Sequence, residues 1–453
     1  MTAAPRLRRV LRLRDLVVVA AASMGPAFSL ATTLAAMVAA AGRWTWLALV
    51  IVAVLMAMIA AGYKRLGERM RDAGSSYAWI RAAFGPAGGA YGAWILLAAS
   101  MFAVLATALP AGTYTLDLLW PGLATNALAV ALAACGWIAG SALLLWYGLR
   151  PTAMLALVLL IAEVVVLAAA ALASAGHARP DAVAFSGGPI AWGGIVSAVG
   201  LGIWLVDGWE SSASTAEEAQ GEPSAPGAGA LVALGLTTAL LLAATWAFTR
   251  IGSGAGFAAH EGDALAYVGA LLGGGWTKLL SVTVLVSIAA TLQTTLVYVS
   301  RSVYAMGRDG LLPRALGELD RRAEPAASIA LITVLSVIFT LAAGVSPTAN
   351  DAFQFVLKGT SWFIGLLFAL TAAAAVRVFA PERTARWSGV VLPGVAGVAL
   401  GVVLLLALVR DDPATRGFIA ISAIIGLPLA LWRGRVVGRA FVAGAEPRTG
   451  SRF

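Results

Sequence analysis

Two stretches, Ser23-Met24-Gly25-Pro26 and Val206-Asp207-Gly208-Trp209-Glu210, interrupt long apolar runs and decide the fold. In the first stretch, proline lacks an amide hydrogen and clashes with the preceding helical turn, and glycine lowers the cost of unwinding. In the second stretch, two carboxylates lie inside an otherwise apolar run, where an ionisable group is costly and needs a reason to exist. The sequence therefore predicts two helices that unwind partway along their length.

The composition indicates that these helices lie in a membrane. Of the 453 residues, 60% are hydrophobic and 12% are charged, whereas a typical soluble protein has about 25% charged residues. Apolar runs of roughly 20 residues match one bilayer crossing, and solid runs favour helices over barrel strands. We therefore expect an all-α membrane protein with twelve transmembrane helices. The predicted spans are 15–40, 44–62, 88–112, 123–147, 152–175, 190–216, 228–252, 270–300, 326–345, 351–376, 388–409 and 416–432.

The distribution of basic residues predicts the orientation of the chain. If the N-terminus is inside and the spans alternate, 24 of the 31 lysines and arginines fall on the inner side and six on the outer side. An excess of lysine and arginine marks cytoplasmic loops. The sequence therefore predicts cytoplasmic N- and C-termini in a plasma (inner) membrane protein. The same distribution explains the net charge of +9 without a nucleic-acid partner.

A broken helix offers unpaired backbone groups to a ligand. The start of a half-helix exposes N–H groups that suit an anion such as a carboxylate, and the end of one exposes carbonyl groups that suit an ammonium group. Breaks at corresponding positions in two halves of a chain are typical of the midplane site of a secondary transporter. A Gly-Pro step can also merely bend a membrane helix, so this alternative stays open for the first break taken alone.

Three segments carry a family resemblance. They are GSSYAWI (74–80) with FGP (84–86), IWLVDGWESS (203–212) and RSVYAMGRDGLLP (301–313). In this order, on a frame of twelve spans, they resemble segments of the amino acid–polyamine–organocation (APC) superfamily of secondary transporters. The resemblance implies the leucine-transporter-type fold, a five-plus-five inverted repeat in which helices 1 and 6 are broken, followed by two extra helices. It divides the chain into a basic arm (1–14), a first repeat (15–175), a second repeat (190–378), helices 11 and 12 (387–434) and a tail (435–453).

The resemblance also implies a substrate site between the two broken helices. The backbone at Gly25, Pro26, Ala27 and Phe28 would face a substrate carboxylate. Carbonyl groups of Ser23, Met24, Val206 and Asp207, next to Gly208, would face an amine. Trp204 would act as an aromatic gate, and Glu210 matches a glutamate implicated in coupling or gating.

The sequence departs from the family pattern around this site. Ala27 replaces a second glycine and Pro26 removes one donor, so a substrate without a carboxylate is conceivable. Glu163 lies near a position where some members have a lysine, and it is a candidate coupling residue. Its alternative role is a hydrogen bond to a neighbouring helix. Lys358 is a further coupling or gating candidate, although its side chain could simply extend to the membrane interface.

Several functional classes are excluded or disfavoured by the residues themselves. One cysteine and two histidines cannot supply the usual zinc ligand sets, and no phosphate-binding glycine loop or catalytic pair is found. We therefore expect a transporter without a cofactor, not an enzyme. It would move amino acids or related amines by alternating access, with proton symport or substrate exchange. The alternatives are a polyamine or organic-cation transporter without carboxylate recognition, and a non-transporting receptor or sensor.

Overall fold

The chain folds into a bundle of helices. The computed structural model describes residues 7–410 and 412–443. The first six residues of the predicted basic arm and the end of the predicted tail (444–453) therefore lie outside the described residues. Within the described ranges no strand forms, and a single isolated bridge pairs Leu11 with Ala219. Ten helical stretches there are long and apolar enough to cross a membrane, which confirms the prediction of an all-α membrane protein.

The helices follow the predicted spans with small shifts at their ends. Up to residue 175 the helices are α1 (Leu13–Met24), α2 (Pro26–Ala41), α3 (Thr45–Arg69), α4 (Ser76–Leu119), α5 (Ala127–Trp146) and α6 (Leu149–Ala175). They are followed by α7 (Trp192–Leu205), α8 (Ser211–Ser214), α9 (Ala225–Thr249), α10 (Gly254–Ala259), α11 (Ala264–Leu272), α12 (Trp276–Arg308), α13 (Ala326–Ala343) and α14 (Ala349–Phe379). The last two helices are α15 (Leu392–Arg410) and α16 (Pro413–Ala443).

Two differences from the predicted spans have local causes. Helix α4 starts well before the predicted span at 88, because a short helical segment precedes a kink at Gly85. Gly85 has φ +76°, a left-handed conformation that glycine adopts readily. The short helices α10 and α11 lie between the seventh and eighth predicted spans, and they are too short for an apolar run of bilayer length to reveal them.

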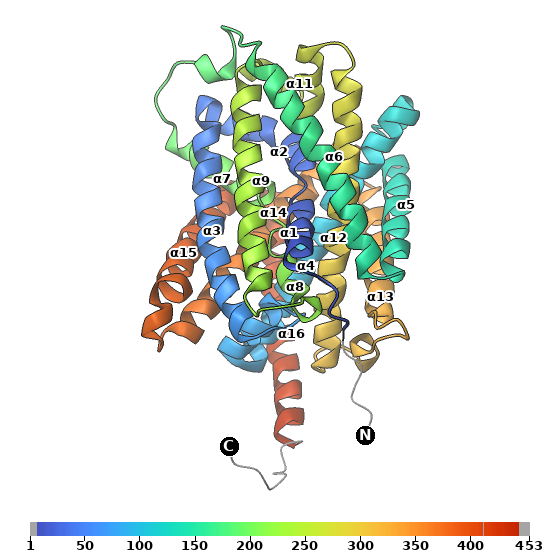
Figure 1. Ribbon diagram of the computed structural model, residues 1–453, viewed down its shortest axis with the longest axis vertical. Coiled ribbons are helices and arrows are strands. Elements are labelled where there is room, and N and C mark those ends of the chain that lie inside the picture. The colour runs from blue at the N-terminus through green and yellow to red at the C-terminus, as the bar shows by residue number, and fades with distance from the viewer. Residues whose placement is uncertain (1–6, 411, 444–453) are drawn as a thin grey trace.

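The two halves of the first span occupy the centre of the bundle. Figure 1 shows α1 and α2 one above the other, with α3 and α15 on one side and α5, α6 and α13 on the other. We call the end of the bundle where α1 begins the α1 face, and the opposite end, where α2 finishes, the α2 face. Helix α12 is the most enclosed, with 72% of its most apolar window buried, against 28% in α6 and α13. The central helices α1, α2 and α12 therefore have the protein interior around them, and the outer helices expose apolar side chains.

Candidate functional site

The two interruptions meet in the interior of the bundle. Helix α1 ends at Met24 and α2 begins at Pro26, and Gly25 between them has φ +50°. Helix α7 ends at Leu205, and Gly208, with φ +105°, lies in the unwound segment that follows. A Cβ atom on Gly208 would lie 2.5 Å from the backbone oxygen of Ser23. Only a glycine therefore lets the second break approach the first this closely.

The unwound segment after α7 is held by its own backbone and by Glu210. The amide of Asp207 donates to the Trp204 carbonyl at 3.2 Å, which tightens the end of α7. The Gly208 amide donates to Oε2 of Glu210 at 3.1 Å. Both acids are largely buried, with 8% of Asp207 and 7% of Glu210 exposed. The carboxylates thus lie at the junction of the two breaks, away from bulk solvent.

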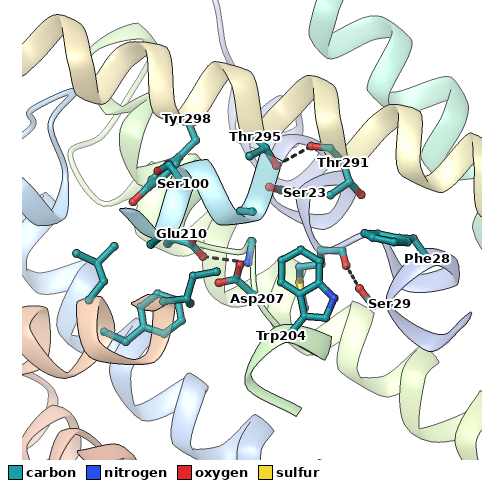
Figure 2. A pocket seen from close by; sticks show the side chains of 17 residues that line it. Ser23, Phe28, Ser29, Ser100, Trp204, Asp207, Glu210, Thr291, Thr295 and Tyr298 are labelled. Carbon is teal, nitrogen blue, oxygen red and sulfur yellow. Dashed lines mark hydrogen bonds between the residues drawn. The ribbon is translucent and has the colours of Figure 1, made fainter. Parts of the chain in front are cut away.

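A cavity opens at this junction, and most of the predicted site residues line it. Its volume is about 30 Å³, enough for about two water molecules, so a larger ligand needs the surrounding helices to move apart. Figure 2 shows the side chains around it. The predicted residues in the lining are Ser23, Met24, Phe28, Trp204, Asp207, Gly208 and Glu210. Gly25, Pro26, Ala27 and Val206 lie in the two breaks but are not among the lining residues.

The start of α2 already has side-chain partners. The Ala27 amide donates to Oε2 of Glu163 at 3.3 Å, and the Phe28 amide donates to Oγ of Ser287 at 3.1 Å. Glu163, on α6, is fully buried. Pro26 has no amide hydrogen to offer. The N–H groups of α2 that the resemblance assigns to a substrate carboxylate are therefore occupied from within the protein.

Carbonyl groups at the end of α1 have partners as well. The Met24 carbonyl accepts from Oγ of Ser29 at 2.7 Å, and the Ala22 carbonyl accepts from Oγ1 of Thr291 at 3.0 Å. The Ser23 carbonyl is the one that faces Gly208 across the junction. These bonds fix the end of α1 against α2 and α12.

Aromatic side chains close the cavity on both sides. Towards the α2 face, Trp204 packs edge-on against Phe28 with ring centroids 5.9 Å apart. Towards the α1 face, Trp209 stacks on Phe368 at 5.2 Å and meets Tyr63 at 4.9 Å. Phe28, Trp204 and Phe368 line the cavity, and Trp209 and Tyr63 pack against Phe368.

Five polar lining residues were not predicted as ligands. They are Ser29, Ser100, Thr291, Thr295 and Tyr298. The hydroxyl oxygens of Ser100 and Tyr298 and the Trp204 indole nitrogen are buried without a hydrogen-bond partner within the protein. Buried polar atoms normally have partners, so these three atoms suit a ligand or water. The available signal was a serine and a tyrosine within otherwise apolar runs.

Lys358 lies away from the cavity. Its Nζ atom is 3.3 Å from Oδ2 of Asp412, and 39% of its side chain is exposed. It lines a separate groove between α7, α14 and α15, together with Arg410 and Trp362. The structure does not bring Lys358 together with Glu163 or Glu210 at the junction.

Below the cavity, a buried arginine joins several elements at the α1 face. Arg301 of α12 has no exposed surface, and it donates to both carboxylate oxygens of Glu218 at 3.1 Å and to Glu324 at 2.6 Å. Glu324 accepts the Leu149 amide at the start of α6. The Glu218 carbonyl accepts the amides of residues 10 and 11. We call Arg301, Glu218 and Glu324 the Arg301 cluster.

A second, more exposed set of charges surrounds this cluster. Arg308 donates to Asp72 at 2.8 Å and to Glu217 at 2.7 Å, and Arg81 donates to Asp309 at 2.6 Å. Burial raises the pKa of the Asp72 carboxyl, and the Arg308 charge opposes that rise. Together these contacts connect the loop after α3, the loop after α8 and the end of α12. The α1 face is therefore sealed by charge pairs.

Comparisons with known proteins identify the family. A profile of the amino acid permease family matches residues 12–428. The chain is 25% identical over 341 residues to the branched-chain amino acid permease BcaP of Lactococcus lactis subsp. cremoris (strain MG1363), a match that covers 68% of this chain and 72% of that protein. Because the family profile spans most of the chain, the protein belongs to the amino acid permease family of the APC superfamily, whose members are membrane transporters and not enzymes.

Proposed function

We propose that the protein carries amino acids or related amines across the plasma membrane by alternating access, and that the cavity between the two breaks holds the substrate. The observation that supports this most strongly is the meeting of Gly208 with the Ser23 carbonyl, beside two buried acids. The two breaks bring backbone ends and two largely buried carboxylates together in the interior of the bundle. In this proposal the acids and backbone ends at the junction bind a small solute.

The proposal includes twelve membrane crossings in two related halves. Helices α1 with α2, and α7 with α8, each count as one interrupted crossing, and α15 and α16 follow the two halves. In the proposed movement, α1, α2, α7 and α8 rock against the other helices around a fixed site. The basic α1 face is cytoplasmic in this proposal, in keeping with the excess of lysine and arginine predicted there.

The proposed gates are the two closures of the cavity. On the α2 face, Trp204 and Phe28 leave the cavity roof together when the outer pathway opens. On the α1 face, Phe368 borders the cavity with Trp209 stacked on it, and the Arg301 cluster must separate before the inner pathway opens. With both closures in place and about 30 Å³ of space, this structure resembles an occluded state without a substrate.

Proton coupling is proposed for the acids at the junction. Glu210 accepts the Gly208 amide in the unwound segment, so a change in its charge alters the hydrogen bonding of the break itself. Glu163 accepts the Ala27 amide at the first break, which makes it the second coupling candidate. Lys358 has no part in the coupling proposed here, because it lies on the outer groove. Substrate exchange is the alternative to symport, and it uses the same site.

Transport by purified protein in proteoliposomes tests the proposal. Labelled amino acids and amines are supplied outside vesicles that are either preloaded with unlabelled solute or given an inward proton gradient. We expect saturable uptake of at least one solute, by counterflow or by the gradient, above that of protein-free vesicles. A complete absence of saturable uptake across the panel contradicts the proposed function, and a receptor or sensor then becomes the better account.

A further inference from the structure

We infer that the preferred substrate is an organic amine that lacks a carboxylate group; the inference rests on the proposed transport function and narrows it. The lining of the cavity contains two carboxylates, Asp207 and Glu210, and within the described chain no lysine, arginine or histidine lines it. A carboxylate on the substrate would bring a third negative group into a buried space. A cationic amine instead neutralises charge there.

Helix ends add to the negative potential of the cavity. Helix α1 finishes at Met24 and α7 finishes at Leu205, so the carboxyl ends of two helices converge on the junction. The carboxyl end of a helix has a partial negative charge and favours a cation. The amino end of α2 also starts at this junction and has the opposite sign, but the Glu163 carboxylate bonded to the Ala27 amide offsets it. Both acids and the carboxyl ends of α1 and α7 therefore favour a cation.

Three of the four backbone positions that the resemblance assigns to a substrate carboxylate have no free N–H group in this chain. Pro26 has no amide hydrogen, the Ala27 amide is bonded to Glu163, and the Phe28 amide is bonded to Ser287. The Ser29 amide closes the first turn of α2 on the Gly25 carbonyl at 2.8 Å. The Glu163 carboxylate therefore takes the place at the start of α2 that a substrate carboxylate would otherwise occupy.

The rest of the lining suits the body of such an amine. Ala99, Ala103, Ile364 and Leu367 provide an apolar wall, and the Trp204 ring can lie against an ammonium group through a cation–π contact. The unpartnered hydroxyls of Ser100 and Tyr298 are neutral donors or acceptors for one further polar group on the ligand. The small cavity favours a short aliphatic or aromatic body.

Matched pairs of ligands test the inference directly. Each pair differs only in the carboxylate: leucine and 3-methylbutylamine, histidine and histamine, lysine and cadaverine, with 4-methylpentanoate as a carboxylate without an amine. Affinities are measured by titration calorimetry on the purified full-length protein, and counterflow of each compound is measured in proteoliposomes. We expect the amine to bind at least about tenfold more tightly than its amino acid in the pairs that bind, and 4-methylpentanoate not to bind.

Two acid variants show whether the cavity causes the preference. Asp207→Asn and Glu210→Gln each keep the side-chain shape and remove a charge, so we expect each to lower the affinity for the amine by about tenfold. Glu261→Gln removes an acid from an exposed loop position and is the matched control, expected to bind as the wild type does. A preference that both cavity variants retain undiminished would overturn the inference, because its cause would then lie elsewhere.

The outcomes separate this inference from the proposed function. If the amino acid of each pair binds as tightly as the amine or more tightly, the inference is wrong and the transport function stands. If no member of any pair shows counterflow, the proposed function fails and the inference falls with it. The wild-type comparison needs no variant to fold, so it decides the matter by itself.

Discussion

Trp204 is the residue that connects the break in α7 with the start of α2. It is 5% exposed, and its ring packs edge-on against Phe28. Such an aromatic pair contributes about 0.5–1.5 kcal/mol beyond the area it buries. We expect Trp204→Ala to raise the KM for uptake by about two- to tenfold at unchanged expression. Trp192→Ala, on the same helix but 64% exposed, is the control, and an equal effect of both changes would remove Trp204 from the gate.

Glu210 is the residue for which charge and backbone geometry are most closely connected. Its carboxylate accepts the Gly208 amide, and glutamine at the same position can still accept that bond but cannot carry a proton. We expect Glu210→Gln to abolish the pH dependence of uptake while counterflow at constant pH remains measurable. Initial uptake rates across a series of external pH values check this. A pH profile parallel to that of the wild type would exclude Glu210 from coupling, and Glu163→Gln would then be tested in the same way.

The sequence predicted some residues of the site and not others. The acids and glycines of the two breaks were found because each is unusual in an apolar run. The contact between Glu163 and Ala27 spans 136 positions along the chain, and no local pattern predicts it. Ser100 and Tyr298 were missed because polar side chains in membrane helices more often bond to neighbouring helices, and only the packing of α4 and α12 shows that these two lack such a bond.

Arg301 of α12 is bonded to Glu218, in the segment after α8, and to Glu324, in the loop before α13, so its effect on stability is felt by several elements. Removing one partner of a buried ion pair costs about 3–5 kcal/mol, because the remaining charge stays buried. We therefore expect Arg301→Met to lower the thermal stability of the detergent-purified protein strongly. Arg321→Met, at an exposed position in the loop before α13, should leave the unfolding temperature close to that of the wild type.

The loss in Arg301→Met should also depend on pH. Burial raises the pKa of the Glu218 carboxyl, and the Arg301 charge opposes this rise. Without the arginine the pKa rises further, so the folded protein holds that proton more tightly than the unfolded chain does. Stability from this group is then present at low pH and is lost as pH increases through the folded pKa. We expect a smaller destabilisation at about pH 5 than at about pH 8, and the opposite order would contradict this account of the cluster.

The helices themselves were largely predictable, because a bilayer requires apolar runs of a fixed length. Helices α5, α6, α9 and α13 begin and end within a few residues of the predicted spans. The exceptions follow from the same rule. The short helices α10 and α11 are stabilised by packing of side chains such as Phe257 and Leu265 on the rest of the protein, and length and hydropathy do not reveal them.

At the scale of the whole molecule, the asymmetry of basic residues predicts which face is cytoplasmic. Single cysteines at exposed positions test this after Cys135→Ser removes the native thiol. We expect Glu261→Cys, in the loop between α10 and α11, to react with an impermeant thiol reagent added outside intact cells. Arg321→Cys should react only after the membrane is opened. The reverse labelling pattern would invert the orientation and exchange the inner and outer gates.

In our proposal, transport depends on the close approach of the two breaks. A methyl group at Gly208 would collide with the backbone of Ser23 and would also be strained at φ +105°, so Gly208→Ala separates the breaks without touching either acid. A methyl group added at Gly235 on α9 would have no atom within 4 Å, so this position serves as the control for the same substitution. The most direct measurement is counterflow of the best substrate into proteoliposomes by the two variants and the wild type. We expect counterflow by Gly208→Ala to fall to the level of protein-free vesicles and counterflow by Gly235→Ala to equal that of the wild type. Wild-type counterflow by a folded Gly208→Ala protein would contradict the claim that the junction of the two breaks is the transport site.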